Sequence, residues 1–179
     1  MKPTSEATYE RARRLANLAL WAVDLQCRRL QTEEPEDKDF VFRKWADFDF
    51  LMVALTRLRR AAKLASGIPD CQQSLVPALA EFDASLSALK KLRDVAEHVD
   101  DYAIDGGRDR SIKRQALEVS VLSMGGSTLE WLGHEMNSDE ALKAGQKLFD
   151  AIREASGGFA QRAQQGVQPD GPASSGPAG

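Results

Sequence analysis

The stretch FDFLMVALTRLRRAAKLA, residues 48–65, decides the fold class of this chain. Its apolar residues recur every three or four positions, the spacing that places them along one face of an α-helix. The predicted apolar face consists of Phe48, Leu51, Met52, Leu55, Leu58, Ala62 and Ala65. The opposite face is basic, and Gly67 with Pro69 ends the helix. Such a helix buries its apolar face against other helices, so a mainly α-helical protein is predicted.

The segment before this stretch is predicted to be a second long helix. It runs from Thr4 or Ser5 to Gln31 without Gly or Pro, and either residue is a suitable N-cap. Its apolar face is predicted from three-four spacing to be Leu15, Leu18, Ala22 and Leu25.

Two further helices are predicted after the central stretch. One opens near Ser74 and continues to about Ile104, and Arg93 takes a position of its apolar stripe. The last begins at Asn137 or Ser138 and ends at the glycine pair 157–158. Its inward residues are predicted to be Ala141, Ala144, Leu148, Ile152 and Ala155.

Between these last two helices the period changes from helix to strand. Leu117, Val119 and Val121 alternate with other residues, a glycine pair follows, and residues 128–132 resume an extended pattern. The predicted fold is therefore an antiparallel four-helix bundle with a small β-hairpin before the last helix. His134 is expected in a loop after the hairpin.

Length and composition indicate how many domains the chain has and which classes of protein it can belong to. The chain has 179 residues, a net charge of −3 and 42% hydrophobic residues. We expect one domain over residues 1–156 and a disordered tail over 157–179, which is rich in Gly, Pro, Ser and Gln. No apolar signal or membrane-spanning run is visible, so a cytoplasmic protein is expected. Cys27 and Cys71 are expected to be free thiols without zinc-ligand neighbours.

The sequence KLRDVAEHVDDY, residues 91–102, is the segment most suggestive of chemistry, because His98 and His134 are the only two histidines. On a continuous helix Asp94, His98, Asp101 and Tyr102 would share one face, and Arg93 would pair with Glu97.

This segment resembles the signature of the HEPN superfamily, helical bundles in which an Arg and a polar residue precede a His by four to six positions. Arg93, Asp94 and His98 match that signature. The resemblance implies a homodimeric, metal-independent endoribonuclease of toxin or defence type, without a cofactor, whose partners are RNA and an antitoxin or other protein. It implies that His98 is the general acid-base, that Arg93 stabilises phosphorane charge and that Asp94 orients His98.

Basic residues are candidates for tracking an RNA backbone if the fold brings them beside His98. They are Arg57, Arg60 and Lys63 on the central helix and Arg108, Arg110, Lys113 and Arg114 after the third helix. Solvated surface charge is the competing interpretation of both groups.

Other interpretations stay open at this point. In one, the protein is a non-catalytic helical interaction or dimerisation module, and Arg93 and His98 serve only helix stability. In another, Asp94, His98 and Asp101 bind a divalent ion. The three tryptophans are expected to pack in the core.

Overall fold

The computed structural model describes residues 3–38, 42–118, 120–123 and 126–157. Val119 and Gly125 of the expected hairpin, and all of the expected tail except Gly157, lie outside the described residues. In the described part of the chain no helix is long and apolar enough to cross a membrane.

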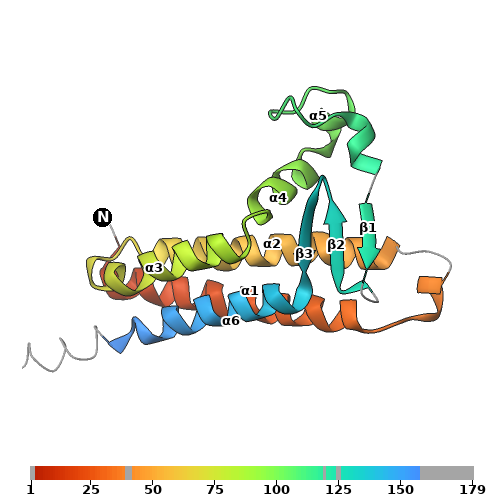
Figure 1. Cartoon of the computed structure of the whole chain (residues 1–179). Coiled ribbons are helices and arrows are strands. Elements are labelled where there is room, and N and C mark those ends of the chain that lie inside the picture. Colours follow the sequence, from red (N-terminus) through yellow and green to blue (C-terminus); the bar gives the residue numbers. More distant parts are fainter. Residues whose placement is uncertain (1–2, 39–41, 119, 124–125, 158–179) are drawn as a thin grey trace, which may run out of the picture.

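The protein is mainly α-helical with one small antiparallel sheet, in agreement with the predicted class (Figure 1). In chain order the elements are α1 (Ser5–Gln31), η1 (Pro35–Lys38), α2 (Phe42–Ala65), α3 (Pro69–Ser85), α4 (Leu89–Glu97), α5 (Val99–Ala103), η2 (Arg114–Glu118), β1 (Ser120–Ser123), β2 (Thr128–Trp131), β3 (His134–Asn137) and α6 (Ser138–Glu154). Helix α1 packs along α2, and α6 packs against α1, α2 and α3.

Helix α1 begins where the sequence predicts, but it buries a different face. Thr4 is the N-cap and its hydroxyl accepts a hydrogen bond from the Ala7 N–H. The buried residues are Tyr9, Ala12, Ala16, Ala19, Val23, Cys27 and Leu30. The predicted inward residues Leu15, Leu18 and Leu25 are exposed instead, Leu18 at 72%.

Both faces of α1 satisfy the three-four spacing, so periodicity alone does not choose between them. Alanines on the buried face let the backbones of α1 and α2 approach closely, which favours that face for packing. The larger side chains are left on the outer side of the helix.

The faces of α2 and α6 follow the prediction. Every residue of the predicted apolar face of α2 is buried. On α6, Ala141, Leu148 and Ile152 are buried, as is the C-cap residue Ala155. Ala144 is half-buried, and Gly145 takes a core position beside it. The Tyr9 hydroxyl donates to the Ile152 carbonyl at 2.7 Å and ties α1 to α6.

The prediction of one continuous third helix is wrong. The chain forms α3, α4 and α5, and α3 begins at Pro69 rather than near Ser74, so Pro77 lies inside it. Leu86 (φ −122°, ψ 50°) separates α3 from α4, and His98 (φ −123°, ψ 33°) separates α4 from α5. These turns direct α4 and α5 away from the long helices (Figure 1).

The predicted hairpin is part of a three-stranded sheet with order β1-β2-β3, both pairs antiparallel. Leu132 and Gly133 both have positive φ, 55° and 71°, and form the two-residue turn between β2 and β3. His134 is therefore the first residue of a strand rather than a loop residue. Leu117 lies in η2, not in a strand.

Candidate functional site

The motif segment lies on α4 and at its junction with α5. Arg93 Nη1 donates to Glu97 Oε2 at 2.5 Å, which confirms the predicted pair, and Arg93 Nη2 lies 3.9 Å from Asp94 Oδ1. The Arg93 side chain is only 16% exposed, and its charge-assisted hydrogen bond to Glu97 of the same helix orients the guanidinium.

His98 stands at the break between α4 and α5. Its backbone N–H donates to the Val95 carbonyl and its carbonyl accepts from the Tyr102 N–H. Its side chain is exposed, and within the described part of the chain the imidazole makes no hydrogen bond. Because His98 has non-helical backbone angles, the predicted continuous face shared with Asp94 and Asp101 does not form.

The divalent-ion interpretation finds no support in this geometry. Among the described residues, no group of three His, Cys, Asp or Glu side chains is placed to hold a metal ion. Asp94, His98 and Asp101 are therefore not such a group.

Tyr102 is a structural residue of the same segment. It is 2% exposed and packs with Val95 and Ile112 in a small cluster separate from the main core. Its hydroxyl accepts a hydrogen bond from the Asp109 N–H at 3.2 Å. Tyr102 thus anchors the loop that follows α5.

The four basic residues proposed to contact RNA lie in or next to that loop. Arg110 donates to the Asp105 carbonyl at 2.9 Å, and the Arg114 N–H donates to the Asp105 carboxylate at 3.0 Å. Arg108 and Lys113 are exposed and form no ion pair with any described residue. Part of this basic group therefore stabilises the loop.

Arg93 also lines a basic hollow of about 460 Å³ between α2 and the α3–α4 region. Arg59 closes one side of it through a bidentate contact with Asp83, both distances 2.6 Å. Arg60 and Lys90 line it without forming an ion pair to a described residue. The sequence does not reveal this hollow, because its residues come from separate helices.

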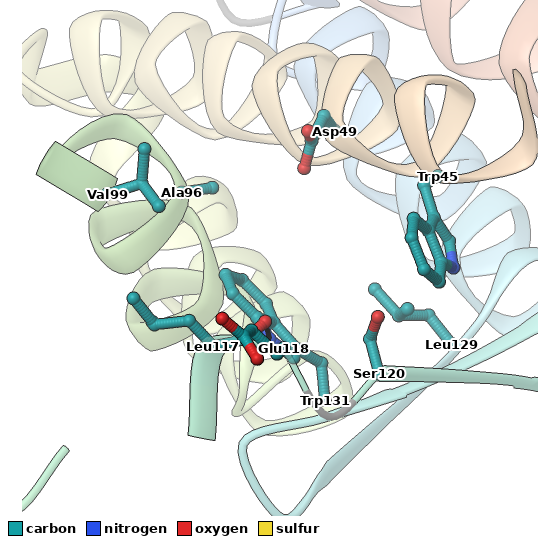
Figure 2. Close-up of a pocket in the computed structure, with 9 residues that line it drawn as sticks. All are labelled: Trp45, Asp49, Ala96, Val99, Leu117, Glu118, Ser120, Leu129 and Trp131. Atoms are coloured by element: carbon teal, nitrogen blue, oxygen red, sulfur yellow. Dashed lines mark hydrogen bonds between the residues drawn. The ribbon is translucent and has the colours of Figure 1, made fainter. Parts of the chain in front are cut away.

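A second hollow, of about 250 Å³, opens between α2, the α4–α5 junction and the sheet (Figure 2). Its lining residues are Trp45, Asp49, Ala96, Val99, Leu117, Glu118, Ser120, Leu129 and Trp131. Two of the three tryptophans therefore line a cavity instead of being confined to the core. Ala96 and Val99 come from the motif segment, whereas Arg93 and His98 do not line this hollow.

Two carboxylates belong to this second hollow. Asp49 points from α2 into it (Figure 2), and packing around Asp49 raises the pKa of its carboxyl above its ordinary value. Asp49 is nonetheless an exposed residue, so water also reaches it. Neither Asp49 nor Glu118 forms an ion pair within the residues that the structure describes.

The outer face of α1 is a candidate interaction surface. Its exposed residues Leu15, Leu18, Trp21 and Leu25 are called the α1 outer stripe below. A hollow of about 360 Å³ lies on each side of the stripe, one against Ala61 of α2 and the other against Leu142 and Phe149 of α6. Periodicity identifies these residues as apolar, but only the packing of α1 shows that they face outward.

Comparison with known proteins adds no relative, since no family model, curated protein or solved structure gives a significant match. The functional inferences therefore rest on the geometry of these sites.

Proposed function

We propose that this protein is a helical interaction module that self-associates through the α1 outer stripe. The observation that carries the proposal is the exposure of four large apolar side chains at positions 15, 18, 21 and 25 of one helix. Contiguous exposed apolar surface on a folded domain is typical of a protein-interaction site.

The shape of the surface favours a second copy as the partner. Leu18 and Trp21, at 72% and 70% exposure, form a ridge. The hollows beside them provide grooves of largely apolar side chains, and polar or charged residues also line these grooves: Asn17, Asp24, Gln146, Arg57 and Arg60. A two-fold arrangement places the ridge of each copy in a groove of the other, as in helix packing by ridges and grooves. The surface spans α1, α2 and α6, and a specific interface typically buries about 800 Å² per partner.

The test is sedimentation velocity of the purified chain over a concentration series. We expect the parent to dimerise and the double variant Leu18→Glu/Trp21→Glu to stay monomeric with an unchanged circular dichroism spectrum. Ile104→Glu is the matched control, because Ile104 is 77% exposed but lies beyond α5. A parent that remains monomeric at roughly 100 μM, a concentration at which a micromolar dimer is populated, would refute the proposal.

The second candidate is a HEPN-like, metal-independent endoribonuclease with a four-helix bundle, and one observation favours it. Arg93 of the motif lines the hollow that also holds Arg60 and Lys90, cations suited to a phosphate backbone. In this proposal His98, whose imidazole is exposed, is the acid-base, Asp94 orients it, and Arg108, Arg110, Lys113 and Arg114 bind RNA.

Cleavage of a labelled RNA pool in EDTA tests this second candidate. The parent is expected to leave cyclic phosphate ends, and His98→Ala, shown to be folded by circular dichroism, is expected to be inactive. His134→Ala is the matched control for loss of an imidazole. If neither the parent nor His98→Ala cleaves RNA, the endoribonuclease proposal is wrong and the interaction module remains as the proposed function.

A further inference from the structure

The hollow in Figure 2 combines negative charge with aromatic walls. Asp49 enters it from α2, and Glu118 borders it at the end of η2. Of the lining residues none is basic, so the charge of Asp49 has no compensating side chain there. Asp49 is only partly shielded from water, and a cation that enters the hollow is attracted by this unpaired carboxylate.

Two indole rings contribute to the same walls. Trp45 comes from α2 and Trp131 from the end of β2, and they lie at different sides of the space into which Asp49 points (Figure 2). Trp131 is fixed in orientation because its Nε1 donates to the Leu117 carbonyl at 3.1 Å. Indole faces attract cations through their quadrupole more strongly than other aromatic rings do.

The remaining walls are mostly apolar, through Ala96, Val99, Leu117 and Leu129, and Ser120 adds one hydroxyl. Apolar walls disfavour a strongly hydrated ion such as a metal cation or a primary ammonium group, because little would replace its lost water. A cation that carries methyl groups contacts apolar and aromatic walls directly. The volume of about 250 Å³ suits such a group better than a large cofactor.

We propose that this hollow binds a methylated ammonium group, with Asp49 and Glu118 supplying charge and Trp45 and Trp131 supplying aromatic walls. The group belongs either to a free small molecule or to a methylated lysine side chain of a partner protein. The proposal is independent of self-association, since no residue of α1 lines the hollow.

The first experiment compares choline with 3,3-dimethylbutanol, the neutral isostere in which carbon replaces the quaternary nitrogen. Calorimetric titration of the full chain is expected to show choline binding at least tenfold tighter than the isostere, and tighter than ethanolamine. In a Trp21→Phe background the only tryptophans left are the two that line the hollow, so choline is also expected to change the fluorescence.

Substitutions locate the site. Asp49→Asn is expected to weaken choline binding about tenfold and Trp131→Phe about three- to tenfold, as for loss of a charge partner or of an indole face. Asp100→Asn is the matched control, because Asp100 is an exposed carboxylate of α5 that does not line the hollow, and it is expected to change affinity less than twofold. Asp49→Asn and Trp131→Phe are accompanied by circular dichroism to show that each is folded.

Peptides distinguish the two sources of the group. A trimethyl-lysine peptide that binds more tightly than choline supports a protein partner, and equal binding supports a free small molecule. Equal affinity for choline and its neutral isostere would overturn the proposal. Equal loss in Asp49→Asn and Asp100→Asn would also overturn it, because the effect would then be one of net charge.

Discussion

Gly107→Ala is the substitution whose effect follows most directly from the packing. A Cβ atom at Gly107 would lie 2.2 Å from Cδ1 and 2.3 Å from Cε1 of the Tyr102 ring. The ring has little room to move, because Tyr102 is 2% exposed and packs with Val95 and Ile112. The hydrogen bond that its hydroxyl accepts from the Asp109 N–H holds the far end of the ring.

The size of the effect follows from two opposing contributions. Overpacking of a filled site costs about 1–3 kcal/mol. Replacing Gly by Ala reduces the conformational entropy of the unfolded chain and returns about 0.4–1 kcal/mol. The net loss of unfolding free energy therefore lies between about 0 and 2.6 kcal/mol. Because the clashing ring is held in place, we expect the upper part of that range, about 1–2.6 kcal/mol, which lowers Tm by about 2–10 °C for a chain of this size.

Urea unfolding followed by circular dichroism, with thermal melts beside it, measures this loss. Gly157→Ala is the control, because a Cβ there meets no atom within 4 Å, and we expect a change within about 0.5 kcal/mol. In a Tyr102→Leu background the additional effect of Gly107→Ala is expected to shrink, since a smaller side chain vacates part of the contested space. Equal stability of Gly107→Ala and Gly157→Ala in the parent background would refute this account of the Tyr102 cluster.

Three further predictions concern an ion pair, two indoles and the thiols. A hydrogen bond from Arg43 lowers the pKa of Asp37 from 3.8 to about 2. In acid unfolding, the parent should therefore be more stable than Asp37→Asn above about pH 4, and this difference should disappear as the pH falls through about 2. Trp131→Phe removes the hydrogen bond to the Leu117 carbonyl and leaves that carbonyl unpaired, whereas the buried Nε1 of Trp45 has no partner among the described residues. In urea unfolding, Trp131→Phe should therefore lower the free energy of unfolding by about 1 kcal/mol more than Trp45→Phe does. Burial raises the pKa of the Cys27 thiol to about 12, and Cys71 is also buried with a raised pKa. Neither thiol should therefore react with a thiol reagent at pH 8 until denaturant is added, and rapid labelling of the native protein would contradict this prediction.

The two proposed interactions use different parts of the molecule. The α1 outer stripe lies on the long helix α1, whereas the hollow in Figure 2 lies where α4, α5 and the sheet approach α2. Loss of self-association in Leu18→Glu/Trp21→Glu should therefore leave choline affinity unchanged. Gly107→Ala should weaken it, because α5 contacts η2 and the two carry the walls Val99 and Leu117.

The extents of α1, α2 and α6 and the buried face of α2 followed from local patterns. The α2 face, the Thr4 cap and the Asn137 cap were predictable, because they depend on residues within one or two turns of helix. The pair between Arg93 and Glu97 was predictable for the same reason, since a helix brings residues four apart together.

What the tertiary structure alone decided is which faces are covered and which distant residues meet. The spacing of α1 suits both its leucine face and its alanine face, and only close packing against α2 selects the alanines and leaves Leu18 and Trp21 outside. The break at His98 turns α5 so that Val99 lines the same hollow as Trp45 and Trp131, residues that no sequence period connects. A periodic pattern reports that a residue is apolar and where it lies on its own helix, whereas burial depends on the other elements that approach that helix.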